Sequence, residues 1–167
     1  MQIEDGSFHL EAIAHKGELV FLEVGNRVGG ADVVATVELA TGVHLPSYEL
    51  RALLGEPVAE ALPEPPAERR WYGWFVHPGH HLKERTFPGL DGAAAFRDSP
   101  HVVVWNELTP GSPLPDHITY QAGETALAGI VSGETPEDTR ALIVDMFASL
   151  SVRTRPVPPL TPAEVSA

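Results

Sequence analysis

The chain has 167 residues, of which 43% are apolar and 20% are charged. This composition is sufficient for a hydrophobic core, and the length alone suggests one domain. The 23 acidic and 11 basic residues give a formal net charge of −12, which argues against binding to nucleic-acid phosphates or to an anionic membrane surface. Cysteine is absent, which excludes disulfides, thiolate metal sites and cysteine nucleophiles.

The sequence contains no apolar run of the length that a membrane-spanning helix needs, and its N-terminus lacks the basic and apolar regions of a secretion signal. We therefore expect a soluble protein of the cytoplasm.

The first predicted element is a hairpin, with strands over 8–15 and 18–25 joined around Lys16 and Gly17. Leu10, Ala12 and Ala14 alternate on the first strand, and Val20, Leu22 and Val24 alternate on the second. If both sets face one core, paired residue numbers sum to 34, with a three- or five-residue loop centred on Gly17. Glu11 then lies directly opposite Glu23, with Cβ atoms about 4.5–5.5 Å apart. A two-residue turn would instead separate the two glutamates onto opposite faces.

Two carboxylates so placed repel each other, and a hard divalent cation with oxygen ligands would relieve the repulsion. Paired glutamates on an exposed face are also commonly just solvated charge. Arg27, which follows in the stretch "GNRVGG", could neutralise them as an ordinary salt bridge. Spacing alone leaves these alternatives open.

Beyond the hairpin, Gly29 and Gly30 predict a turn, followed by a helix over 31–41 that Gly42 ends. A second helix is predicted over 47–54, with Ser47 as its N-cap and "GEP" as its terminator. Residues 56–69 are rich in proline and glutamate and predict a connector.

Strands are predicted over 70–76, 81–87, 101–108 and 125–132. The clearest helix follows, with Thr135 as cap and an apolar stripe assigned to the core; its members are Leu142, Ile143, Met146, Phe147 and Leu150. The proline-rich residues 154–167 predict a flexible tail. The fold class is α+β, an antiparallel sheet with packed helices, in two parts over 1–55 and 70–153.

The segments "FHLE" and "LVFLEVGNRVGG" resemble the metal- and phosphate-binding region of the ATP-grasp ligases, in particular the carboxylate–amine ligase branch. There a pattern similar to H-x-E followed by E-x-x-x-R-x-G-G recurs. "YGWFVHPG", "LTPGSPL" and "AGIVSGETPEDTRALI" resemble, in their order, the closing subdomain of that branch. The resemblance covers about residues 6 to 152 and implies the C-terminal half of an ATP-grasp fold.

The resemblance implies an enzyme that uses ATP and Mg²⁺ (or Mn²⁺) to phosphorylate a carboxylate, which an amine then attacks to form an amide or peptide bond. Glu11 and Glu23 would be metal ligands, and Arg27 would contact the transferring phosphate. Gly29 and Gly30 would let backbone amides approach an anion. The usual family asparagine position is occupied by Gly25 here, so Asn26 is a candidate third ligand.

The family places its phosphate-clamping lysines and adenine pocket in a preceding half that has no counterpart in this sequence. We therefore expect the 167-residue chain by itself to lack ligase activity and to bind Mg-ATP feebly. We also expect a homo-oligomer or a complementary subunit. The alternative function is a non-catalytic module, derived from an ATP-grasp protein, that needs a partner subunit.

Three further features are less specific. His77, His80 and His81 in "HPGHH" are typical of a polar loop, although a zinc or nickel site or a position near substrate stays open. His9 falls on the Glu11 face and could orient a ligand, approach substrate or be purely structural. The aromatic cluster "WYGWF" predicts packing of the second sheet.

Overall fold

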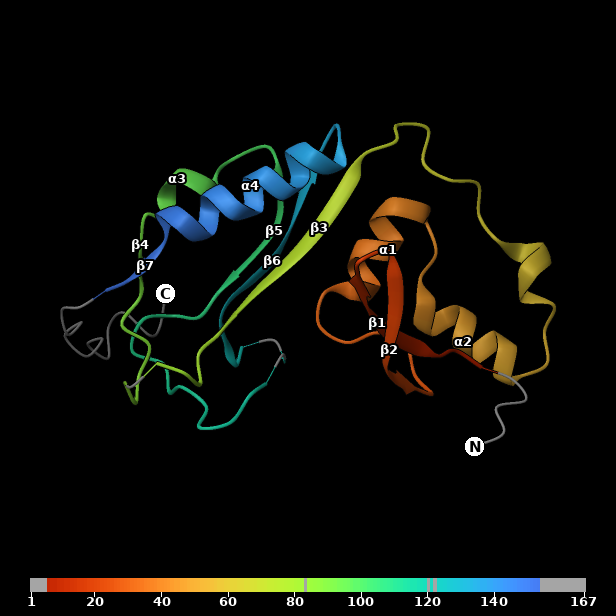
Figure 1. Ribbon diagram of the computed structural model, residues 1–167, viewed down its shortest axis with the longest axis horizontal. Helices are drawn as coiled ribbons and strands as arrows, with labels where there is room; N and C mark the ends of the chain where they lie inside the picture. Colours follow the sequence, from red (N-terminus) through yellow and green to blue (C-terminus); the bar gives the residue numbers. More distant parts are fainter. Residues whose placement is uncertain (1–5, 83, 120, 122, 154–167) are drawn as a thin grey trace, which may run out of the picture. The chain divides into compact units, whose positions relative to one another are not determined.

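The computed structural model describes residues 6–82, 84–119, 121 and 123–153 (Figure 1). The chain forms two compact units, Met1–Glu68 and Arg69–Ala167. Both contain antiparallel strands and helices, so the predicted α+β class is confirmed. The predicted tail over 154–167 lies outside the described residues.

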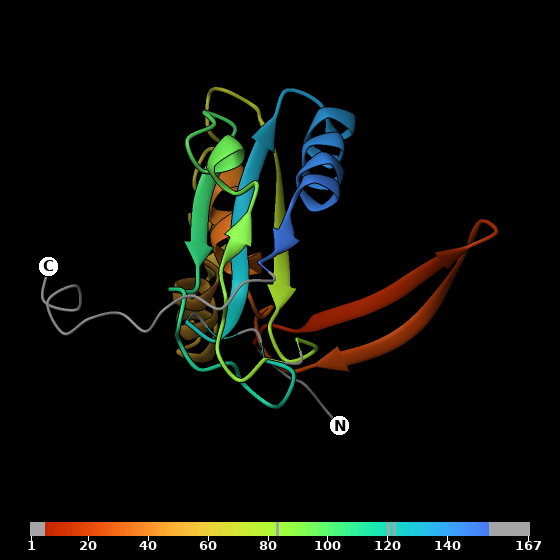
Figure 2. The same cartoon turned by 90° about the vertical axis from the view of Figure 1, so that its left-hand side faces the viewer.

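The described part of the first unit contains a two-stranded antiparallel sheet, two α-helices and a 3₁₀-helix. The sheet pairs β1 (His9–His15) with β2 (Glu18–Gly25). The helix α1 (Val33–Thr41) packs on α2 (Leu45–Leu53), which in turn contacts η1 (Val58–Ala61). Figure 2 shows the hairpin as a long two-stranded arm that extends away from these helices of its own unit. The strands therefore rely mainly on each other.

The two α-helices differ in how well the sequence predicted their ends. Gly42 ends α1 in the left-handed conformation, with φ of 76°, and its N–H donates to the Glu38 carbonyl, as predicted. The predicted Ser47 cap of α2 is wrong, because the helix starts earlier and His44 is the N-cap residue. Pro46 fits in the first turn, where a missing N–H costs nothing. The Ser47 hydroxyl instead lies 2.7 Å from His44 Nδ1.

The second unit is built on a three-stranded antiparallel sheet in the order β3-β6-β5. These strands are β3 (Trp71–Pro78), β5 (Val102–Glu107) and β6 (Thr125–Gly133). The long helix α4 (Pro136–Ser149) packs on β3 and β6, and α3 (Ala94–Arg97) contacts β5. The short strands β4 (Leu90–Asp91) and β7 (Ser151–Val152), which the sequence did not predict, pair with each other.

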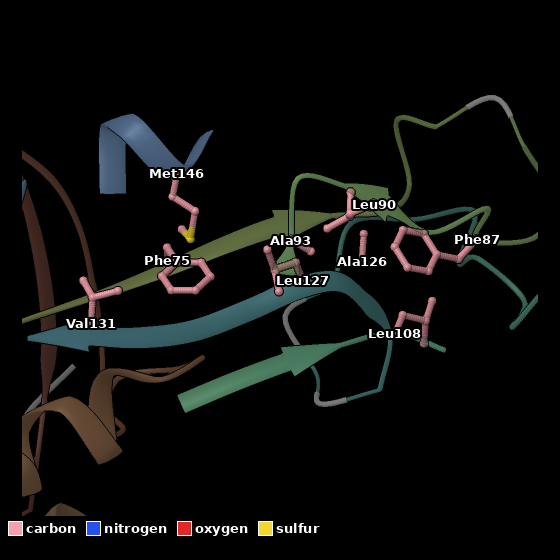
Figure 3. Close-up of a cluster of buried hydrophobic side chains, with 9 residues drawn as sticks. All are labelled: Phe75, Phe87, Leu90, Ala93, Leu108, Ala126, Leu127, Val131 and Met146. Atoms are coloured by element: carbon pink, nitrogen blue, oxygen red, sulfur yellow. The ribbon is translucent and has the colours of Figure 1, made fainter. Parts of the chain in front are cut away.

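A continuous hydrophobic core lies in the second unit (Figure 3). Its buried side chains are Phe75, Phe87, Leu90, Ala93, Leu108, Ala126, Leu127, Val131 and Met146. As predicted, Thr135 caps α4, accepting a hydrogen bond from the Asp138 N–H. Met146 is fully buried, and Leu142, Ile143 and Leu150 pack partly buried against this core, whereas Phe147, the fifth member of the predicted stripe, is 37% exposed.

The predicted strand over 81–87 is wrong. Its described residues are irregular apart from one bridge between Thr86 and Pro113, and Lys83 lies outside the described residues. The segment bonds to a neighbouring loop instead, with the Phe87 N–H donating to the Ser112 carbonyl over 2.8 Å. Pro88 and Pro113 lack the N–H groups that a continued ladder would need.

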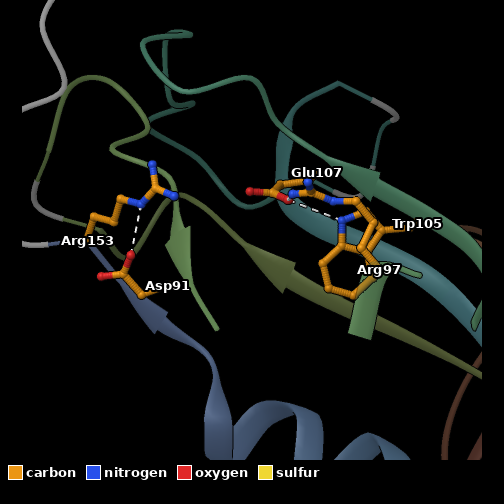
Figure 4. A network of polar contacts seen from close by, with 5 residues as sticks. All are labelled: Asp91, Arg97, Trp105, Glu107 and Arg153. Atoms are coloured by element: carbon orange, nitrogen blue, oxygen red, sulfur yellow. Dashed lines mark hydrogen bonds and ion pairs between the residues drawn. The ribbon is translucent and has the colours of Figure 1, made fainter. Parts of the chain in front are cut away.

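Polar contacts fasten the short elements to the second unit (Figure 4). Arg97 on α3 forms an ion pair with Glu107 on β5, and Trp105 Nε1 donates to the same carboxylate over 3.2 Å. Arg153 Nε lies 3.0 Å from Asp91 Oδ1 beside the β4–β7 pair. These contacts are structural.

Burial differs sharply between the two units. All the buried side chains among the described residues lie between Phe75 and Met146, and the described part of the first unit has none. The first unit therefore has no dry core of its own. Within the described ranges, no helix is both long and apolar enough to cross a membrane.

Candidate metal and phosphate site

The open end of the hairpin has the predicted register. Glu11 pairs directly with Glu23, flanked by Leu10 opposite Val24 and His9 opposite Gly25. Directly paired residues on antiparallel strands lie on the same face of the sheet. The prediction that the two glutamates oppose each other on adjacent strands is confirmed.

The turn end has a different register. His15 pairs with Glu18, so the turn contains only Lys16 and Gly17, and the predicted three- or five-residue loop is wrong. Both turn residues have positive φ, 48° for Lys16 and 83° for Gly17, as two-residue hairpin turns with matching twist require.

A β-bulge explains why the pairing register differs between the open end and the turn end of the hairpin. Glu11 pairs with Glu23 but the next residue, Ala12, pairs with Phe21, so Leu22 is an extra residue on β2. Without this extra residue a two-residue turn would place Leu22, and not Glu23, opposite Glu11. The bulge thus returns the second glutamate to the face of the first.

The bulge also changes which residues share a face. The predicted alignment of Val20, Leu22 and Val24 is wrong, because Val20 pairs with Ile13 on the glutamate face. The opposite face, which we call the apolar hairpin face, is made of Leu10, Ala12, Ala14, Leu19, Phe21 and Val24. The glutamate face carries Glu11 and Glu23 at one end and His15 and Glu18 at the other.

His9 contacts the candidate ligand set directly. Its Nε2 lies 3.1 Å from Glu11 Oε1, and its side chain is 23% exposed against 45% for Glu11. On the other side of the ring, a Cβ added to Gly29 would lie 3.2 Å from His9 Nδ1. His9 therefore sits between a carboxylate and the loop after β2. The sequence placed His9 on this face but gave no sign of its contact with Glu11.

Asn26 and Arg27 follow β2 in an exposed bend. The Arg27 guanidinium folds back on its own loop, with Nη1 donating to the Val28 carbonyl over 3.0 Å. Among the described residues Arg27 forms no ion pair with either glutamate, and Glu11 pairs with His9 instead. In the described structure, the ordinary salt bridge weighed for Arg27 is therefore not formed, and Arg27 is exposed.

Gly29 and Gly30 lead directly into α1. Neither has a positive φ; the left-handed residue in this loop is Ala31, with φ of 51°. Gly29 is required for another reason, since an added Cβ would lie 2.6 Å from Val33 Cγ1. The N-cap residue of α1 is Asp32, and partial burial raises the pKa of its carboxyl group above the usual value.

Within the described residues, the histidine loop of the second unit is not part of any group of three or more metal-binding side chains. His77 and His81 stack with ring centroids 5.0 Å apart and planes 15° from parallel. His80 Nδ1 is buried without a hydrogen-bond partner in the described structure. Burial, and then the neighbouring His81, lowers the pKa of His77.

The donor set of the hairpin fits Mg²⁺. Within the described residues, no three histidine, aspartate or glutamate side chains gather closely enough to hold a metal by themselves. Mg²⁺ is commonly held by only one or two carboxylates, with water and substrate phosphates as its other ligands. Glu11 and Glu23 match that mode, whereas a metal that needs a complete protein cage would not fit.

Comparison with known proteins establishes the fold. No protein-family model and no curated sequence matches the chain. Among solved structures, an L-amino acid ligase from Bacillus licheniformis aligns with a TM-score of 0.65 and 23% identity over 89% of this chain. A phosphoribosylglycinamide synthetase from Anaerococcus prevotii aligns with a TM-score of 0.59 and 12% identity, also over 89%.

Both of these proteins are ATP-grasp carboxylate–amine ligases. The chain therefore has the fold found in these ligases, and the resemblance inferred from the sequence is confirmed at that level. It covers 36% and 37% of the two ligase chains, so it corresponds to little more than a third of each.

Proposed function

We propose that this chain supplies the metal- and phosphate-binding part of an ATP-dependent carboxylate–amine ligase. The observation that carries the proposal is the direct pairing of Glu11 with Glu23, at the end of the hairpin that leads into Arg27. The β-bulge that restores this pairing has an energetic cost, because it interrupts the hydrogen-bonded ladder between β1 and β2. If the two glutamates were only solvated surface charge, pairing them would bring no gain to offset that cost.

The proposed roles follow from the chemistry of the side chains. Glu11 and Glu23 hold Mg²⁺, with Asn26 as a further oxygen ligand, and His9 fixes the Glu11 carboxylate by their contact of 3.1 Å. When bound, Mg²⁺ neutralises charge on the phosphates of ATP. Arg27 offers a fork of N–H donors to the transferring phosphate. Gly29 and Gly30 keep the backbone before α1 open to an anion.

Acyl-phosphate formation on a carboxylate depends on positioning and charge neutralisation more than on covalent chemistry from the protein. The metal ligands and Arg27 can neutralise and orient phosphates. The proposed substrates are a carboxylic acid and an amine.

The alternative function is a non-catalytic module that requires a partner. The lack of any buried residue in the described part of the first unit favours it, because such a unit depends on a covering surface. The two functions differ in metal binding: the module has no need for the glutamate pair.

Mn²⁺ binding to the 167-residue chain, followed by electron paramagnetic resonance, tests the proposal. We expect weak binding, of about millimolar strength for an open site with few protein ligands. Glu23→Gln should abolish it. Glu18→Gln is the matched control, since Glu18 lies on the same face and strand, four β1 positions away or about 13 Å. Equal effects of the two substitutions would show that only solvated charge attracts the ion.

A further inference from the structure

We propose that the histidine loop, residues 77–82, is a pH-sensitive switch that stays closed while its histidines are neutral and opens when they take up protons. The closed state is the one that the structure shows, in which the loop follows the last residues of β3. The proposal goes beyond the ligase chemistry, because all the side chains on which it depends belong to the second unit.

The three imidazole rings of the loop lie against one another. His77 and His81 stack with ring centroids 5.0 Å apart, and the ring of His80 meets that of His81 edge-on at 5.7 Å. Two positive charges at such separations repel each other, and a like charge nearby disfavours a protonated ring. The closed loop is therefore most stable with neutral histidines.

No carboxylate among the described residues compensates a positive charge on the loop. Ion pairs that include histidine join His9 to Glu11 and His117 to Asp116 in the described structure, and neither involves the loop. His80 Nδ1 is buried without a hydrogen-bond partner, so a proton added there would create a buried N–H group with no acceptor. An unpaired buried donor carries its full desolvation penalty.

The elements around the loop contribute no charge to its interior. β6, which pairs with β3, has no titratable side chain, and α4 contacts His77 through Phe147, with ring centroids 6.1 Å apart. Glu124, which precedes β6, accepts a hydrogen bond from Thr119, and Lys83 lies outside the described residues. The other charged or titratable side chains of α4 and of the segments 84–85 and 113–117 are all exposed; they are Glu137, Asp138, Arg140, Asp145, Glu84, Arg85, Asp116 and His117.

The closed loop packs on one end of the hydrophobic core. A Cβ added to Gly79 would lie 2.5 Å from Leu114 Cδ2. Leu82, whose N–H donates to the Gly79 carbonyl over 3.0 Å, packs against the core together with Leu114. Pairing with β6 is already irregular between His77 and Pro78, so the loop can open locally while the rest of the sheet stays paired. Opening uncovers Leu82 and Leu114.

Acid favours the open state. Burial, and then the neighbouring His81, lowers the pKa of His77 below its usual 6.5 in the closed loop, so the open loop takes up a proton at a higher pH than the closed loop. The closed state is therefore fully favoured above pH 6.5. Below that pH its advantage falls by about tenfold per pH unit, at most, for each proton taken up on opening.

Amide hydrogen exchange of the 167-residue chain, measured by NMR in metal-free buffer between pH 7.5 and pH 5.5, tests the switch. The protection factor of the Leu82 N–H reports the loop. The N–H of the buried Leu108, which donates to the Ala126 carbonyl over 3.1 Å, reports the core. We expect lower protection at Leu82 than at Leu108 at each pH, and a fall of about 10-fold at Leu82 toward pH 5.5. Equal protection at the two residues, or a Leu82 value that does not change with pH, would overturn the proposal.

Histidine variants assign the effect to the loop. His77→Gln should reduce the fall at Leu82 to about 2-fold or less, because it removes the group whose protonation opposes the closed state. His101→Gln is the matched control, since His101 is an exposed histidine of the same unit outside the loop, and it should keep the wild-type fall. A wild-type fall in His77→Gln, or its loss in His101→Gln, would contradict the assignment.

Ring resonances of the unsubstituted chain give a test that does not depend on any variant folding. Their titration by NMR should show a midpoint below pH 6.5 for His77, with the loss of Leu82 protection over the same pH range. A His77 ring that titrates at pH 6.5 or above would overturn the switch.

Discussion

Gly29→Ala tests whether the loop after β2 is packed as tightly as the structure shows. The added Cβ would lie 2.6 Å from Val33 Cγ1 and 3.0 Å from Val33 Cβ, whereas carbon atoms pack best at about 3.5–4.0 Å. Val33 cannot rotate away easily, because a β-branched residue in a helix has one strongly preferred rotamer. The start of α1 must therefore shift.

Overpacking of this kind costs about 1–3 kcal/mol, which corresponds to about 5- to 150-fold faster opening of α1. Amide hydrogen exchange by NMR at Thr36 and Val37 measures the opening. Gly30→Ala is the matched control, because its nearest neighbour would be the flexible Arg27 Nη1 at 3.7 Å. Exchange rates in Gly29→Ala that equal those of the wild type or of Gly30→Ala would refute the packing argument.

Two further predictions concern the second unit. Met146→Ala removes a fully buried side chain and should lower the free energy of unfolding by about 2–5 kcal/mol; urea titration followed by tryptophan fluorescence measures it, with the exposed Val144→Ala as control. Burial lowers the pKa of His77 from its usual 6.5, so His77 takes up a proton at a higher pH in the unfolded state than in the folded state. The contribution of His77 to the free energy of unfolding should therefore be complete above pH 6.5 and decrease as the pH falls below 6.5. His77→Gln should lose less stability than the wild type between pH 7.5 and pH 5.5 on the same assay, and an identical loss would contradict the prediction.

The sequence predicted the second unit well where several signals agreed. Around α4, the cap, the proline of the first turn and the apolar stripe all gave the same answer, and the structure confirms it for every member of the stripe except the exposed Phe147. The segment over 81–87 lacked such agreement. Its composition suited a strand, but Pro88 and Pro113 prevent a continued ladder. Phe87 is buried in the core, and Leu82 packs partly buried against it.

The hairpin shows why part of a site can be predicted while its geometry is not. The opposition of Glu11 and Glu23 was correct, but it was inferred from one constant register. The run Leu19, Val20, Phe21 and Leu22 is apolar throughout, so alternation could not show which residue was extra. The sequence also could not show where the buried residues lie. A composition rich enough for a hydrophobic core does not reveal that, among the described residues, every buried side chain belongs to the second unit.

The stability of the hairpin limits the metal affinity that the glutamate pair can reach. Glu11 and Glu23 oppose each other only while β1 and β2 are paired, and a two-stranded hairpin is marginally stable at best in water. A divalent cation that binds the paired state shifts the population toward that state. Part of its binding free energy is therefore used to keep the strands paired, which is a second reason, besides the small number of protein ligands, to expect weak metal binding by the 167-residue chain.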